Sequence, residues 1–219
     1  MIRTSHRKAA DLPAVIPVFP LEALLLPHGQ LPLNIFEPRY LAMTRDALAG
    51  ERLIGMVQPS DARVAADNPP VYPTGCAGRI TSFSGTDDGR FLITLTGISR
   101  FCIREELPLL EGYRRVVPGW RAFARDLASD DEPSFDRDRL LRGLRAYFQH
   151  HRIEADWDAI TSVPGERLVT SIAMICPFEP SEKQALLEAP DLDKRAKLLT
   201  SIVEMAALDQ SRDGPGARH

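Results

Sequence analysis

The sequence predicts an α+β protein in which a β-rich part precedes a helical part. Of the 18 prolines, 13 lie in the first 133 residues, and proline is excluded from helix interiors. Segment 80–96 has the alternation and polar turn of a β-hairpin. After Pro133 the apolar residues recur at intervals of three and four, as in amphipathic helices. Strands and loops are therefore expected first, and a small bundle of helices after them.

The hairpin is the strongest strand signal. Ile80–Phe83 precedes a polar turn at 85–89, and apolar residues alternate with smaller or polar ones from 91 to 96. Gly97 interrupts this alternation, which predicts a bulge or a sharp bend of the kind that closes a barrel. Further strands are expected at 53–57, at 114–117 and in parts of 15–35.

Helices are expected in both parts. Among the strands, Pro38 suits a first helical position and Gly50 is placed to end that helix. In the second part, four amphipathic helices are expected: 135–151, 166–176, one that begins at a capping-box pattern of Ser181 and Gln184, and one capped by Asp191.

These elements divide the chain into five parts. They are a flexible arm at 1–11, a β-rich barrel subdomain at 12–122, a linker at 123–133, a helical subdomain at 134–208 and a flexible tail at 209–219.

Composition limits the function. With 27 basic and 30 acidic residues, the net charge is −3, so no global field draws the chain to nucleic acid or to an anionic membrane. No apolar run approaches the 18 or so residues that a membrane helix requires. The three cysteines are odd in number and far apart, which fits a reducing compartment. We expect a cytoplasmic protein without membrane contact.

Signatures of catalysis are missing. The sequence contains no GxxxxGK[ST] loop, no GxGxxG, no HExxH and no CxxC. Gly97-Ile98-Ser99 begins like a nucleophile elbow, but Phe101 stands where the second glycine is needed. The neighbouring His150 and His151 diverge by about 100° on a helix, unlike metal ligands. We therefore expect no enzyme, no catalytic or metal-binding residues and no cofactor.

An alternative is RNA binding. Arg114, Arg115, Arg121 and Arg125 lie close to Trp120 and Phe123. Arginine interleaved with aromatic residues is typical of nucleic-acid surfaces. Acidic residues at 126, 130 and 131 offset this charge, so we expect a strand end followed by a linker here.

The most distinctive segment is 16–40. Prolines at 17, 20, 27 and 32 prevent this segment from forming a helix or a regular ladder of β-sheet hydrogen bonds. Its many apolar side chains need apolar surroundings. Two roles remain open: a wall of the barrel, or an apolar groove for an extended peptide.

Several motifs together resemble one family. Pro17–Leu21 and Pro32–Tyr40 closely resemble the opening of the Lon N-terminal domain, also called the Lon substrate-binding domain. Further agreement lies at Gly78-Arg79-Ile80, Asp88-Gly89-Arg90, Gly97 with Arg100-Phe101, Glu182–Glu188 and Asp191–Leu199. The resemblance covers about residues 14–208.

The resemblance implies a PUA-like antiparallel pseudo-barrel followed by a C-terminal helical bundle. It also implies participation in recognising unfolded or tagged polypeptides. The ATPase and peptidase parts of Lon protease are missing, and Gly216 stands where a peptidase serine would be. We therefore expect a stand-alone, non-catalytic binding module that serves as an adaptor or chaperone-like factor for unfolded polypeptides, with a separate ATP-dependent protease as a candidate partner.

The expected peptide-binding residues lie on the proline-rich segment. They are Phe19, Leu26, Phe36, Glu37, Arg39 and Tyr40. The alternative for the polar ones is structural: Glu37 caps the helix and pairs locally, Arg39 is solvated or bridges to the sheet, and Tyr40 packs. A small-molecule pocket ranks last, because the zinc-binding cysteines of the related cereblon ligand domain are missing.

Overall fold

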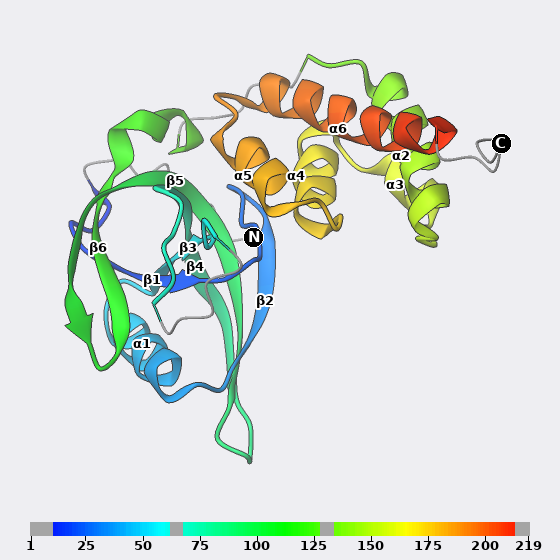
Figure 1. Ribbon diagram of the computed structural model, residues 1–219. Coiled ribbons are helices and arrows are strands. Elements are labelled where there is room, and N and C mark those ends of the chain that lie inside the picture. The colour runs from blue at the N-terminus through cyan, green and yellow to red at the C-terminus, as the bar shows by residue number, and fades with distance from the viewer. Residues whose placement is uncertain (1–10, 62–67, 128–133, 213–219) are drawn as a thin grey trace, which may run out of the picture. The chain divides into compact units, whose positions relative to one another are not determined.

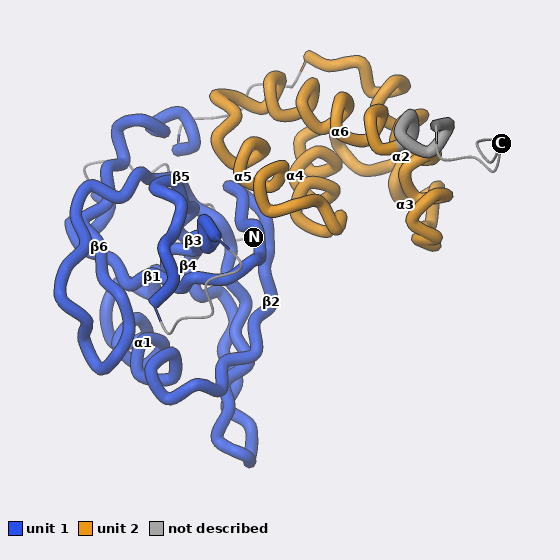
Figure 2. Tube along the Cα trace, viewed as in Figure 1, with its two compact units in different colours: residues 1–130 blue, residues 131–219 orange. Residues whose placement is uncertain are grey.

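The computed structural model describes residues 11–61, 68–127 and 134–212 (Figure 1). The chain forms two compact units, residues 1–130 and residues 131–219 (Figure 2). Most of the predicted arm, the second half of the predicted linker and the end of the predicted tail lie outside the described residues. Within that description, no helix is long and apolar enough to cross a membrane.

The first unit is a sheet that closes on itself. Its elements are β1 (Ile16–Pro20), β2 (Gln30–Ile35), α1 (Pro38–Ala49), β3 (Leu53–Val57), β4 (Thr74–Gly85), β5 (Phe91–Leu110), β6 (Tyr113–Gly119) and the 3₁₀ segment η2 (Trp120–Leu127). The strand order is β2-β5-β4-β3-β1-β6, and β6 also pairs with β5. The last pairing closes a ring of five strands, with β2 added beside β5. The predicted pseudo-barrel is confirmed.

Strand β5 makes the closure possible because it is long and irregular (Figure 1). Its first half pairs with β2, and its second half pairs with β6 on the same side. The register with β4 shifts where Ala77 faces Ser99 and Gly78 faces Gly97. This is the irregularity that Gly97 predicted, and such a bulge bends the strand.

One strand pair departs from the antiparallel expectation. Strands β1 and β3 run parallel, with Val18 opposite Gly55. The connection between them contains β2 and α1, and a crossover of that length returns the chain in its original direction.

The barrel core centres on the ring of Phe101. This side chain is fully buried, and its edge contacts Trp120 at a ring-centroid distance of 5.7 Å. A Cβ atom at Gly55 or at Gly75 would lie 2.8 Å from the Phe101 ring. Glycine is therefore needed on two strands to make room for one phenylalanine.

A second glycine contact fixes the connection between β1 and β2. A Cβ atom at Gly97 would lie 2.0 Å from the carbonyl oxygen of Leu26. The His28 N–H donates to the Gly97 carbonyl at 3.0 Å. The connection thus crosses β5 in direct backbone contact, and Leu24, Leu25 and Leu26 are buried beneath it.

The second unit is helical. It contains α2 (Arg137–His151), α3 (Trp157–Ser162), α4 (Gly165–Ile175), α5 (Pro180–Glu188) and α6 (Leu192–Arg212). Helices α2 and α6 approach closely at Gly143, where a Cβ atom would lie 2.8 Å from Val203. The core is made of side chains at helical spacing, among them Leu140, Leu144, Leu168, Ile172, Leu186, Leu199 and Val203.

Some helix predictions differ from the structure. Helix α3 was not expected, and α6 continues into the predicted tail. The capping interaction of α5 begins earlier than predicted, because the Glu179 N–H donates to the Glu182 carboxylate at 2.9 Å. Asp191 does cap α6, accepting from the Lys194 N–H at 2.8 Å.

Candidate functional site

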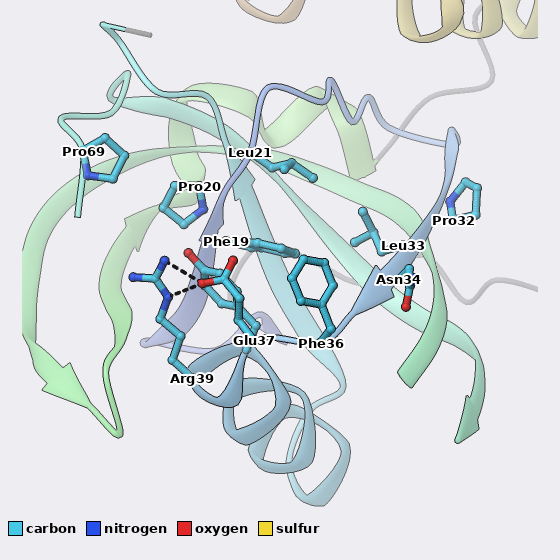
Figure 3. Close-up of a pocket in the computed structure, with 11 residues that line it drawn as sticks. Phe19, Pro20, Leu21, Pro32, Leu33, Asn34, Phe36, Glu37, Arg39 and Pro69 are labelled. Atoms are coloured by element: carbon cyan, nitrogen blue, oxygen red, sulfur yellow. Dashed lines mark hydrogen bonds and ion pairs between the residues drawn. The ribbon is translucent and has the colours of Figure 1, made fainter. Parts of the chain in front are cut away.

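A hollow of about 340 Å³ opens where β1 ends, β2 runs and α1 begins (Figure 3). Its volume is within the range of small ligand pockets. It is lined by Phe19, Pro20, Leu21, Pro32, Leu33, Asn34, Phe36, Glu37, Arg39, Tyr40 and Pro69. The lining therefore joins the two ends of the proline-rich segment to a residue much later in the chain.

Phe36 is the exposed aromatic residue of the hollow. Its side chain is 62% exposed, whereas the preceding Ile35 is 1% exposed. The contrast arises because successive side chains of an extended chain point to opposite sides, and Ile35 takes the inward position at the end of β2. Pro38 begins α1 directly afterwards. Figure 3 shows the Phe36 ring beside that of Phe19.

Two buried lining residues form a tilted aromatic pair, with an angle of 38° between the ring planes. The rings of Phe19 and Tyr40 lie 4.2 Å apart between centroids, and these residues are 7% and 6% exposed. One comes from β1 and the other from the first turn of α1, so the pair connects strand and helix. The Arg39 guanidinium carbon lies 4.6 Å above the Tyr40 ring, a cation–π arrangement.

The mouth carries one ion pair. The Arg39 Nε–H donates to Glu37 Oε2 at 3.0 Å, and Arg39 Nη2 lies 2.8 Å from the same oxygen. Glu37 stands at the N-cap position of α1, but its side chain makes no capping hydrogen bond. The expected side-chain cap by Glu37 is therefore wrong, whereas its expected local pairing is confirmed by the contact with Arg39. The pair leaves the mouth without net charge.

The structure brings together all the predicted peptide-binding residues except Leu26. The Leu26 side chain is fully buried and does not line the hollow. The reason is the crossing at Gly97, which presses the Leu24–Leu26 stretch onto the barrel. Leu26 therefore leaves the candidate site and belongs to the core.

Sequence reasoning missed part of the lining. Five of the missed residues lie on the segment already singled out for its prolines and apolar residues, which was the only signal for them: Pro20, Leu21, Pro32, Leu33 and Asn34. Pro69 comes from the stretch before β4. Its only sequence signal is the Pro69-Pro70 pair, which indicates a stiff loop but not where that loop lies.

The chemistry of the hollow is that of a binding surface. Its lining offers aromatic, aliphatic and proline side chains, one amide and one ion pair, and none of the lining residues is a serine, cysteine, histidine or lysine. Across the described parts of the chain, no group of three or more histidine, cysteine, aspartate or glutamate side chains is arranged to hold a metal ion.

Two arginines of the RNA alternative, Arg114 and Arg115, have partners within the protein. Arg114 Nη2 donates to both carboxylate oxygens of Glu106, at 2.8 and 2.7 Å, and Arg114 Nη1 donates to the Pro69 carbonyl at 2.6 Å. Arg115 Nη2 donates to the Pro108 carbonyl at 3.2 Å. A phosphate would have to compete with these partners.

Known proteins resemble the chain over most of its length. It is 26% identical over 204 residues to Lon protease from Anaeromyxobacter dehalogenans, a match that covers 88% of this chain and 23% of the relative. It is also 26% identical over 202 residues to Lon protease 2 from Myxococcus xanthus, covering 88% of this chain and 24% of the relative. The chain thus spans about a quarter of the length of these relatives.

Solved structures show the same fold. A Lon N-terminal domain protein from Xanthomonas campestris superposes with a TM-score of 0.61 at 23% identity, over 85% of this chain and 97% of the other. The N-terminal domain of a Mycobacterium avium complex Lon protease gives a TM-score of 0.58 at 15% identity, over 86% and 97%. Residues 15–205 match the family described as the ATP-dependent protease La (LON) substrate-binding domain. The chain therefore belongs to this family, as its motifs predicted.

Proposed function

We propose that the chain binds extended polypeptide segments, without cleaving them, by seating an apolar side chain in the hollow between β1, β2 and α1. The observation that carries the proposal is Phe36, a large apolar side chain that is 62% exposed at the rim of an apolar hollow. Isolated exposed apolar residues are ordinary, but an exposed aromatic residue over an apolar depression is typical of a binding site. Membership of a substrate-binding family supports the same function.

The expected affinity is low and the sequence tolerance broad. Burying one or two large apolar side chains contributes about 1.5–3 kcal/mol each, and ordering the segment offsets part of this gain. Binding in the micromolar range or weaker follows. The paired charges of Glu37 and Arg39 at the mouth select neither an acidic nor a basic ligand.

A soluble peptide with a central aromatic residue tests the proposal. The probe is the acetylated and amidated nonapeptide Lys-Thr-Val-Thr-Phe-Thr-Val-Thr-Lys, titrated into the full chain and followed by calorimetry and by NMR chemical shifts. Phe36→Asp is expected to lower the affinity at least tenfold. Ile175→Asp, at a side chain in the helical unit that is 78% exposed, is the matched control and is expected to bind normally.

Two results would overturn this function. One is the lack of any shift change with the probe at millimolar excess. The other is unaltered affinity in Phe36→Asp, which would place the binding surface elsewhere.

The finer role is that of an adaptor or chaperone-like factor that presents unfolded polypeptides to a separate ATP-dependent protease. Under this role the chain changes the rate at which such a protease degrades denatured casein, and Phe36→Asp removes the change. An unchanged rate, with peptide binding intact, rejects the adaptor role and leaves the binding function standing.

A further inference from the structure

The direction of the hydrogen bonds along β2 follows from one bond at its start. The Gly97 N–H donates to the Gly29 carbonyl at 2.9 Å, and the register continues from there with Leu31 opposite Leu95 and Leu33 opposite Ile93. In an antiparallel ladder, alternate residues bond to the neighbouring strand and those between them direct their main-chain groups away.

The intervening residues of β2 therefore face the outer edge. Gln30, Pro32 and Asn34 direct their main-chain groups away from β5. Pro32 supports this assignment, because a residue without an N–H is tolerated where no ladder bond is required of it.

Within the described residues, this outer edge has no strand partner. Among the described strands β2 pairs only with β5, and Gln30, Pro32 and Asn34 are exposed. An open edge presents donors and acceptors that can pair with another extended chain. Here the edge offers the N–H and C=O groups of Gln30 and Asn34, and the C=O of Pro32 alone.

The open edge and the hollow coincide. Pro32 and Asn34, which face the edge, also line the hollow, together with Leu33 and Phe36 from the same stretch. Figure 3 shows Pro32, Leu33 and Asn34 following one another along β2 toward Phe36. A segment with one side chain in the hollow therefore has its main chain beside the edge of β2.

We infer that the bound polypeptide adds to the outer edge of β2 as a further strand. This inference rests on the proposed function and specifies how it operates. The occupant is an extended segment whose main chain pairs with Gln30 and Asn34, while one large apolar side chain enters the hollow beside Phe36. Strand addition adds main-chain hydrogen bonds, which do not depend on the sequence of the ligand, to the apolar contact in the hollow, which explains broad sequence tolerance. It excludes helical segments, and it excludes proline at the pairing positions of the ligand.

Backbone methylation of the probe tests this binding mode. Each inner amide of the nonapeptide is N-methylated in turn, which removes one donor without changing a side chain. Strand addition predicts losses of about three- to tenfold, the worth of one net hydrogen bond, at alternate positions only. If methylation has no effect, or the same effect everywhere, the inference is wrong although the proposed function stands. If the unmethylated probe does not bind, both fail.

Amide hydrogen exchange in the full chain gives a second readout. Strand addition predicts that the probe slows exchange of the Asn34 N–H, whereas the Leu33 N–H, which already faces β5, changes little. Unchanged exchange at Asn34 in the presence of bound probe overturns the inference. The inference is also overturned if, without peptide, exchange of the Asn34 N–H slows as the protein concentration rises. A second copy of the chain would then occupy the edge.

Matched substitutions complete the test. Pro32→Ala supplies the missing N–H at the edge and is expected to tighten probe binding about threefold. Asn34→Pro removes a donor from the edge and is expected to bind more weakly than Asn34→Ala by a similar factor, because both variants lose the Asn34 side chain that lines the hollow and only Asn34→Ala keeps the N–H. Equal affinities for all of these variants contradict strand addition.

Discussion

The Arg100 guanidinium and the Asp126 carboxylate form a buried ion pair inside the barrel unit. Arg100 Nη2 lies 2.7 Å from Asp126 Oδ1, while the Nε–H and the main-chain N–H of Arg100 each donate to Oδ2 at 2.9 Å. The side chains are 2% and 7% exposed. The Phe123 ring lies 4.4 Å from the guanidinium carbon. The pair fastens η2 to β5.

Asp126→Ala is therefore expected to destabilise the barrel unit by about 3–5 kcal/mol, because it leaves a buried guanidinium without its counter-charge. Asp88→Ala is the control. It breaks the pair of Asp88 with Arg90, whose side chains are 53% and 47% exposed, and a pair this exposed contributes little to stability. Urea unfolding followed by Trp120 fluorescence in a Trp157→Phe background measures both. Equal destabilisation by the two substitutions would contradict the structural role of the buried pair.

The ion pair also shows a structural role that local sequence patterns do not predict. The segment 123–133 was interpreted as a linker because its side chains are small and acidic, yet 123–127 belong to η2 and Asp126 is nearly buried. Composition reports average polarity, whereas the role of Asp126 depends on Arg100, 26 positions away. Local sequence patterns relate residues that are only a few positions apart, so they could not indicate this pair.

Patterns with a local cause were reliable. The period of two predicted the β4–β5 hairpin, the period near 3.6 predicted α2, α4 and α6, and Pro38 with Gly50 marked α1. The parallel pairing of β1 with β3 and the burial of Leu26 depend on contacts between distant segments, so they needed the structure. The same applies to Pro69, whose place in the hollow no neighbouring residue indicates.

Gly97→Ala is expected to destabilise the barrel by about 1–3 kcal/mol or more, since the new Cβ atom would meet the Leu26 carbonyl oxygen at 2.0 Å. The Leu24–Leu26 stretch and the β5 backbone at Gly97 would have to move apart. Gly85→Ala is the control, because a Cβ atom at Gly85 meets nothing within 4 Å. This substitution is expected to change the free energy of unfolding by less than about 0.5 kcal/mol. Thermal unfolding of both variants measures the difference, and a Gly97→Ala protein as stable as the parent would show that the crossing is not tight.

Stability of the helical unit is expected to fall at high pH. Burial raises the pKa of the Cys176 thiol to about 12 from its ordinary value of 9.0, and burial raises the pKa of the Tyr147 hydroxyl to about 12 from 10.0. Above pH 9 the unfolded chain releases protons that the folded chain retains. The free energy of unfolding is therefore constant with respect to these groups below pH 9 and decreases as the pH rises from about 9 to 12.

Two substitutions separate the contributions to this pH dependence. Cys176→Ala is expected to remove the part that begins near pH 9, and Tyr147→Phe the part that begins near pH 10. Urea unfolding at pH 7, 9 and 10.5, followed by circular dichroism at 222 nm, measures both. If Cys176→Ala begins to lose stability at the same pH as the parent protein, the thiol is not the cause of the loss.

The chain is expected not to bind single-stranded RNA, even at low salt. Neutralising phosphates requires arginines that are free to pair with them, and Arg114 is already held by Glu106 and by the Pro69 carbonyl. A 20-nucleotide oligouridylate in a filter-binding assay at about 50 mM salt measures this, with Glu106→Gln as the informative variant, since it releases Arg114 from its carboxylate. Weak retention in Glu106→Gln but not in the parent would confirm that the ion pair suppresses RNA binding. Retention by the parent that falls steeply with salt would instead revive the RNA alternative.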